Sequence, residues 1–171
     1  IDVIMENQDY IMQVVMDETG KPIQEAMSME IYSAIDSLAF YAKRAPKWLK
    51  DESRSMHGPM QFLKKTKVAF KPRGVIGVIT PWNGPFILSI NPAIQAVLAG
   101  NSVIIKPSEV TPKSGMLVEE MFKKADAPDN LVQVLIGDGQ VGADLINLKP
   151  DKVSFTGSIK TGKLIARQCG E

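Results

Sequence analysis

The chain has 171 residues, enough for one folded domain of ordinary size. Its formal net charge is +1, with 44% hydrophobic and 23% charged residues, so we expect neither a nucleic-acid nor a membrane partner. No apolar stretch approaches the roughly 20 residues of a membrane-spanning helix, and no signal peptide is visible at the amino end. The lone cysteine, Cys169, excludes an internal disulfide and favours a reducing compartment, which we expect to be the cytoplasm.

Two amphipathic helices are predicted at the start of the chain. The first ends near Gly20, and the second begins at Pro22, because proline is tolerated in a first helical turn. Apolar residues then recur at helical spacing as far as Ala42. Between residues 45 and 59 this pattern is lost, and prolines, a glycine and several charges predict an exposed connection.

The next segment, residues 62–70, alternates in hydrophobicity and predicts a half-exposed strand. His57, just before it, has no His, Cys or carboxylate partner at ligand spacing, so no metal site is predicted. The chain then enters an unbroken apolar run from Val75 to Ile79, which predicts a strand buried on both faces.

From Val75 onward, predicted strands alternate with predicted helices. The strands are 75–79, 102–106, 131–136 and 152–155. The helices are 85–99, 112–125, 143–148 and one after Ser158 that runs through 166. In the first of them, Pro92 either kinks the helix or delays its start. Thr111 is the predicted cap of the second. This alternation predicts an α/β fold, namely a doubly wound parallel sheet with right-handed crossovers and helices on both faces.

The ends of the four predicted strands share one edge of such a sheet, where open α/β sheets bind nucleotides. Gly137, Gly139 and Gly142 have dinucleotide-motif spacing, but they follow the third strand, and Asp138 would oppose a phosphate. The Thr-Gly-Ser motif at 156–158 is the better phosphate candidate, because it pairs free helix amides with a hydroxyl. A simple helix cap is an equally good interpretation of that motif.

Three side chains lie at or just after the ends of the first two predicted strands. Glu109 can accept hydrogen bonds from both hydroxyls of an adenosine ribose, and Lys106 can donate to the same sugar or to a phosphate. Taken singly, each is more simply read as a solvated charge. Asn83 can donate its amide to a developing oxyanion, although an isolated asparagine is more commonly a turn residue or helix cap.

Taken together, the motifs resemble the aldehyde dehydrogenase superfamily over nearly the whole chain. The most specific segments are Gly77-Val-Ile-Thr-Pro-Trp-Asn83, Val103-Ile-Ile-Lys-Pro-Ser-Glu109, Val153-Ser-Phe-Thr-Gly-Ser158 and Glu18-Thr-Gly-Lys-Pro22. The resemblance implies a helical part of a cofactor domain at 1–59 and a strand of an oligomerisation sheet at 60–73. It also implies a Rossmann-like NAD(P)-binding core at 74–171, truncated before the catalytic domain.

In that family a cysteine thiolate attacks the aldehyde carbon, a hydride passes to the nicotinamide, and water releases the acid. The resemblance implies that Asn83 is a catalytic residue that donates to the thiohemiacetal oxygen. The cofactor-binding residues that it implies are Ile79, Thr80, Pro81, Trp82, Asn83, Lys106, Ser108, Glu109, Gly139, Gly142, Phe155, Thr156, Gly157, Ser158 and Thr161. No metal is implied.

The resemblance places the family's catalytic cysteine and glutamate base beyond residue 171. Neither Cys169 nor Glu171 has the family's sequence context for these residues. Both ends of the sequence fall within predicted helices, so we expect a fragment of a longer protein that cannot oxidise an aldehyde by itself. The longer protein is expected to be a homo-oligomer that acts on a small-molecule aldehyde.

NAD is the expected cofactor, with NADP possible, because Glu109 would repel a ribose phosphate while Lys106 would attract one. Two alternatives to an aldehyde-oxidising enzyme remain open. One is a nucleotide-binding module without chemistry of its own, and the other is a relative that makes an acyl-CoA or reduces an acyl phosphate. The sequence beyond residue 171 would distinguish them.

Overall fold

The structure, a computed structural model, describes residues 1–170; Glu171 lies outside them. Its helices are α1 (Asp2–Glu6), α2 (Gln8–Thr19), α3 (Ile23–Glu25), the π-helix η1 (Ala26–Tyr32), α4 (Ser33–Trp48), the 3-10 helix η2 (Pro59–Phe62), α5 (Ile87–Leu98), α6 (Pro112–Lys124), α7 (Gly139–Asn147) and α8 (Ile159–Cys169). Its strands are β1 (Glu52–Arg54), β2 (Thr66–Val68), β3 (Val75–Ile79), β4 (Ser102–Lys106), β5 (Val132–Val134) and β6 (Lys152–Phe155).

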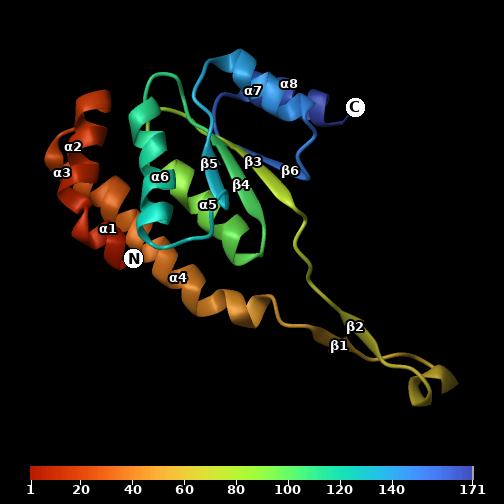
Figure 1. Cartoon of the computed structure of the whole chain (residues 1–171). Helices are drawn as coiled ribbons and strands as arrows, with labels where there is room; N and C mark the ends of the chain where they lie inside the picture. Colours follow the sequence, from red (N-terminus) through yellow and green to blue (C-terminus); the bar gives the residue numbers. More distant parts are fainter. Residues whose placement is uncertain (171) are drawn as a thin grey trace.

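The main sheet is parallel, with the strand order β5-β4-β3-β6. Its first strand, β3, has the second strand on one side and the fourth on the other, so the winding direction reverses at β3. Helices α5 and α6 cover one face and α7 and α8 the other, while the opening helices form a further layer outside α5 and α6 (Figure 1). The doubly wound α/β fold predicted from the sequence is confirmed.

Alternate residues of β3 enter two separate cores. Ile76 and Val78 pack with α5, α6 and the opening helices, whereas Ile79 packs with Leu145 and Ile146 of α7. A strand with both faces covered must be apolar throughout, which explains the unbroken run. Burial of each such side chain is worth roughly 1.5–3 kcal/mol, so this strand anchors the domain.

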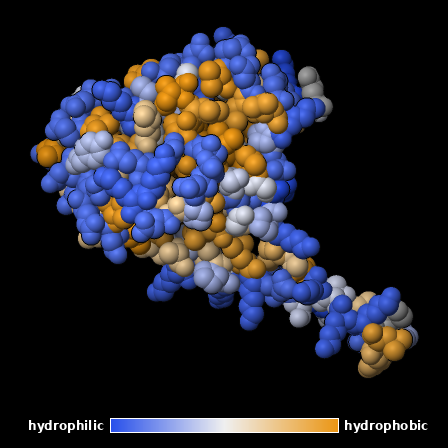
Figure 2. Space-filling view, in the orientation of Figure 1, coloured by the Kyte–Doolittle hydropathy of each residue, from blue (hydrophilic) through white to orange (hydrophobic). Residues whose placement is uncertain are grey.

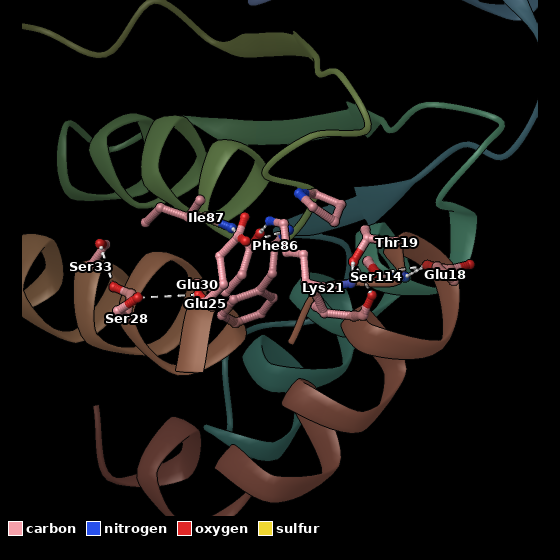
Figure 3. A network of polar contacts seen from close by, with 12 residues as sticks. Glu18, Thr19, Lys21, Glu25, Ser28, Glu30, Ser33, Phe86, Ile87 and Ser114 are labelled. Atoms are coloured by element: carbon pink, nitrogen blue, oxygen red, sulfur yellow. Dashed lines mark hydrogen bonds and ion pairs between the residues drawn. The ribbon is translucent and has the colours of Figure 1, made fainter. Parts of the chain in front are cut away.

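A buried carboxylate joins the opening helices to α5 (Figure 3). Glu30, on η1, is fully buried and accepts hydrogen bonds from the backbone N–H groups of Phe86 (3.1 Å) and Ile87 (2.9 Å). Its other oxygen forms an ion pair with Lys21, which compensates the buried charge. Glu30 therefore caps the amino end of α5 from a distant part of the sequence.

A second carboxylate does the same for α6. Glu18 accepts from the backbone N–H groups of Lys113 (2.8 Å) and Ser114 (2.7 Å) and from the Ser114 hydroxyl (2.6 Å). Thr111 occupies the predicted cap position, but its buried hydroxyl has no hydrogen-bond partner in the part of the chain that the structure describes. Thr111 is therefore the N-cap of α6, as predicted, but the capping hydrogen bonds come from Glu18 and not from its hydroxyl.

The opening helices depart from prediction at two places. The first helix is interrupted at Asn7, whose side-chain amide donates to the Val3 carbonyl at 2.7 Å. The second continues to Trp48, past the expected end, and contains Pro46 in its last turn. The rings of Phe40, Tyr41 and Trp48 pack together across this last part of α4, with centroids 5.4–6.4 Å apart, and stabilise it.

The part of the expected connection that follows α4 and the expected strand at 62–70 form a projecting two-stranded arm instead. The unpredicted strand β1 pairs antiparallel with β2, with Glu52 opposite Val68. Strand β2 has three residues, all exposed, and is therefore shorter and less buried than predicted. The arm extends away from the core and carries a hydrophobic tip, where Phe62 and Leu63 are 84% and 80% exposed (Figures 1 and 2).

The remaining differences concern element bounds. Helix α7 begins at Gly139 instead of residue 143, because Asp138 accepts a hydrogen bond from the Gln140 N–H at 2.9 Å and caps it. Helix α5 begins at Ile87 and passes through Pro92, so the proline does not delay its start. Strand β5 is shorter and α8 longer than predicted. None of the helices that the structure describes is long and apolar enough to cross a membrane.

We predict that Thr111→Val stabilises the protein by about 1 kcal/mol, because it removes a buried hydroxyl without a partner and keeps the side-chain shape. Urea unfolding measures the change. The matched control is Ser114→Ala, which deletes a hydroxyl bonded to Glu18 and should cost about 1.5–3 kcal/mol. A loss of stability in Thr111→Val would show that this hydroxyl is satisfied.

Candidate functional site

The register of the parallel sheet places three predicted residues side by side. Ile79, the last residue of β3, is opposite Lys106 on β4 and Phe155 on β6. Neighbouring strands lie about 4.8 Å apart, and residues in register point to the same face. An aliphatic, a cationic and an aromatic side chain therefore form a continuous row at the carboxyl edge of the sheet.

A cleft of about 430 Å³ opens above this row. Its lining includes all but one of the predicted cofactor-binding residues: Ile79, Thr80, Pro81, Trp82, Lys106, Ser108, Glu109, Gly139, Gly142, Phe155, Thr156, Gly157, Ser158 and Thr161. The exception, Asn83, is exposed in the loop after β3 but does not line the cleft. Residues that were not predicted complete the lining: Ala143, Ile146, Leu164, Ile165 and Gln168. They come from α7 and α8, and their positions within these helices give no sign in the sequence that they line a cleft.

Lys106 and Glu109 form the charged part of the cleft. The Lys106 side chain is only 5% exposed, and its Nζ lies 3.3 Å from Oε2 of Glu109, whose side chain is 57% exposed. The pKa of the Glu109 carboxyl is lowered, first by a hydrogen bond from its own backbone N–H and then by the hydrogen bond and charge of Lys106. Partial burial and the charge of Asp138 raise this pKa but do not outweigh the lowering. Glu109 is therefore ionised at neutral pH. Its contribution to stability is present above its unfolded-state pKa and is lost as the pH falls through the lowered value.

Two helix amino ends meet the cleft and differ in their caps. Helix α7 is capped by the carboxylate of Asp138, which already supplies the negative charge that a helix amino end attracts. Helix α8 is capped by the Ser158 hydroxyl, which accepts from the Thr161 N–H at 3.1 Å and lies 2.9 Å from the Thr161 hydroxyl. Because the cap of α8 is uncharged, the amino end of α8 attracts an anion more strongly than the amino end of α7 does.

The loop from β3 to α5 is fixed at its start. The Thr80 N–H donates to the Lys106 carbonyl at 3.2 Å, and the Thr80 hydroxyl lies 2.9 Å from that of Ser89. Thr80 is thus buried and packs towards α5, while Trp82 is 57% exposed at the cleft. The loop therefore presents Trp82 and Asn83 outward from a fixed base.

The glycines of the predicted dinucleotide motif have different roles. A Cβ on Gly137 would lie 2.3 Å from Val141, so this glycine is required by local packing. A Cβ on Gly139 would meet nothing within 4 Å, and one on Gly142 would meet Lys106 only at ordinary contact distance. These two glycines leave open space on the α7 side of the cleft.

A second cavity, of about 510 Å³, lies between α5 and the base of the arm, and none of the predicted site residues lines it. It is larger than the cleft but lacks the convergence of strand ends that ligand sites in open α/β sheets share. No cluster of His, Cys, Asp or Glu suited to a metal ion occurs among residues 1–170. The cleft is therefore the candidate site.

A doubly wound parallel sheet with such a cleft at its switch point defines a nucleotide-binding type of α/β protein. A model of the aldehyde dehydrogenase family matches residues 1–171. The chain is 44% identical to a 4,4'-diapolycopene aldehyde oxidase of Methylomonas sp over 166 residues, covering 96% of this chain and 31% of that protein. It is 38% identical to a putative NADP-dependent succinate-semialdehyde dehydrogenase of Mycolicibacterium smegmatis, covering 99% and 32%.

Among solved structures, the chain is similar to an NAD⁺ complex of an aldehyde dehydrogenase from Bacillus cereus. The TM-score is 0.90 and the identity 32%, over 99% of this chain and 34% of that one. The chain therefore belongs to the aldehyde dehydrogenase family, as its motifs predicted. It spans about a third of the length of the curated relatives it matches.

We predict that Gly157→Ala destabilises the protein by about 1–3 kcal/mol, because the new Cβ would lie 2.6 Å from the Phe155 ring in the cleft floor. Denaturant unfolding provides the measurement. Gly139→Ala is the matched control and should cause no loss, since its Cβ meets nothing within 4 Å. Equal effects of the two substitutions would contradict the packing described for Phe155.

Proposed function

We propose that the longer protein carrying this chain is an NAD(P)-dependent aldehyde dehydrogenase, and that the chain supplies its cofactor cleft and one oxyanion donor. The observation that carries this proposal is the meeting of residues from separate strand ends in one cleft at the switch point of the sheet. The proposed domain division is helical at 1–59, the oligomerisation strand at 60–73 and the cofactor core at 74–171.

The cleft fits a nicotinamide dinucleotide. Glu109, ionised beside Lys106, offers paired acceptors for the ribose hydroxyls of the adenosine half. The hydroxyl-capped end of α8 at Ser158 suits a pyrophosphate, and the space beside Gly139 admits a flat ring system. When bound, the cofactor supplies a hydride acceptor, and Trp82 forms part of the wall of its cleft.

Asn83 is the residue of this chain proposed to act on the reacting aldehyde. Its side-chain amide donates to the oxygen that becomes negative when the cysteine thiolate, from the part of the protein beyond this chain, adds to the carbonyl carbon. A donor fixed in advance needs no reorganisation as the charge develops. By comparison with other oxyanion donors, this hydrogen bond is worth roughly 3–4 kcal/mol.

Free aldehydes are the proposed substrates. The names of the Methylomonas and Mycolicibacterium relatives describe an aldehyde oxidase and a semialdehyde dehydrogenase, which favours oxidation of a free aldehyde. Neither name supports a purely nucleotide-binding module or a relative that forms acyl-CoA.

We further propose that the protein forms homo-oligomers through the β1–β2 arm. The arm projects from the core, and its exposed Phe62 and Leu63 would be covered by pairing with another subunit (Figure 2). A cytoplasmic location fits the single cysteine, since Cys169 is exposed and free.

The direct test is the oxidation of aldehydes by the full-length protein, measured as formation of the reduced nicotinamide. We expect turnover, and we expect Asn83→Ala to lower kcat by about 10²–10³-fold while the affinity for NAD changes little. Asn91→Ala, in the body of α5, is the control and should retain kcat. Absence of turnover with a broad set of aldehydes and both cofactors would contradict the proposal.

NAD is the proposed preferred cofactor, although the Mycolicibacterium relative is named for NADP. We predict that Glu109→Gln weakens NAD binding about tenfold, as expected for a lost charged acceptor, and weakens NADP binding less. Calorimetric titration of both cofactors measures this.

The pH dependence gives a second readout. Protonation removes the charged acceptor, so NAD affinity of the unmodified protein should fall as the pH drops through the lowered pKa of Glu109. The Glu109→Gln variant should lack that decline. A variant with the same pH profile and the same cofactor preference would show that Glu109 does not bind the ribose.

A further inference from the structure

The loop that carries Asn83 is held at its far end by a group outside the cleft. After Asn83, the residues Gly84, Pro85 and Phe86 are buried, and Phe86 is completely inaccessible to solvent. The first free backbone amides of α5, those of Phe86 and Ile87, point towards η1 (Figure 3). Whatever binds these amides determines where the loop joins the helix.

Glu30 binds both of them. One carboxylate oxygen accepts from the two amides at 3.1 and 2.9 Å, and the other forms an ion pair with Lys21. The carboxylate is fully buried, so water cannot replace it. A charged acceptor shared by two amides is a stronger constraint than a neutral cap, because hydrogen bonds to charged groups are about twice as strong as neutral ones.

The two fixed ends leave little freedom between them. Thr80 is tied to β4 and to Ser89, and Phe86 is tied to Glu30. The Pro85 carbonyl also accepts from the Ser89 hydroxyl at 2.7 Å. Trp82 and Asn83 therefore lie on a short bridge whose shape depends on both anchors.

We propose that Glu30 is a positioning residue for the aldehyde dehydrogenase reaction, which acts by holding the loop so that the Asn83 amide meets the developing oxyanion. This role rests on the proposed function and deepens it. Glu30 touches neither substrate nor cofactor. A displacement of about 1 Å at a reacting group can cost up to 10²-fold in rate, so a remote anchor of this kind has a measurable effect on kcat.

Glu18, on the neighbouring opening helix α2, offers a matched control. Its carboxylate caps helix α6, which packs on the sheet, by accepting from the backbone amides of Lys113 and Ser114. Helix α6, however, does not follow the loop that carries Asn83. Glu18→Gln and Glu30→Gln each remove the negative charge of a carboxylate cap. Only the second weakens the anchor of Asn83 and the ion pair of Glu30 with Lys21.

The experiment is a double-mutant cycle in the full-length protein. Glu30→Gln should lower kcat about tenfold, with the KM for NAD changed by less than about threefold. In the Asn83→Ala background the same substitution should lower kcat by less than about twofold, because Glu30 acts through Asn83. Glu18→Gln should leave kcat within about twofold of the unmodified protein.

Several results would overturn the proposal. An unchanged kcat in Glu30→Gln, or an equal loss with and without Asn83, would make Glu30 a purely structural cap. If Glu30→Gln does not fold, the cycle is run with Glu30→Asp, which keeps the charge and shortens the reach. In that variant an intermediate loss of kcat coupled to Asn83 is expected, and an uncoupled loss contradicts the proposal.

Hydrogen exchange separates this inference from the proposed function, because it needs no turnover. Exchange in the segment 84–88 should rise in Glu30→Gln and stay unchanged in Glu18→Gln. Unchanged exchange in Glu30→Gln would refute the anchoring itself. If exchange is faster in Glu30→Gln but the unmodified protein oxidises no aldehyde, the anchoring by Glu30 stands, whereas the proposed function and the positioning role of Glu30 in the reaction are refuted.

Discussion

The arrangement of the site depends on one constraint, the hydrogen-bonded register of β3 with both of its neighbours. Because Ile79 is level with Lys106 and Phe155, the three strands end together and their loops open on one side. Two cores, one on each face of β3, hold this register, since a slip by one residue would exchange the faces. The cleft is thus a consequence of strand pairing, which brings residues far apart in sequence together.

The electrostatics of the same edge direct an anion to one position. In a parallel sheet every helix that follows a strand begins at the carboxyl edge, so α5, α6, α7 and α8 all present positive dipole ends there. Carboxylates of Glu30, Glu18 and Asp138 cap the first three. The Ser158 hydroxyl caps the fourth and adds no charge. The opening helices therefore do more than cover the sheet, since two of their carboxylates cap α5 and α6, and the uncharged end of α8 is the position that we propose for a phosphate.

Features encoded by neighbouring residues could be predicted, and those that depend on distant partners could not. The apolar run ending at Ile79 and the prolines after the first two strands identified the fold, and all but one of the cofactor-binding residues that the motifs implied line the cleft. The capping roles of Glu18 and Glu30 could not be recognised, although Glu18 belongs to one of the family motifs, because their partners lie 56 to 96 residues away. Strand β1 was missed for a similar reason, since only pairing with β2 makes it a strand.

The most direct measurement is a crystal structure of the full-length protein with NAD. We expect the adenosine ribose beside Lys106 and Glu109, the pyrophosphate at the first turn of α8 and the nicotinamide against Trp82. Binding in the larger cavity between α5 and the arm, near Arg73 and Lys152, would contradict the account, because that cavity shares none of these residues. So would a cofactor in the cleft whose phosphates lie at α7, where Asp138 already fills the helix end.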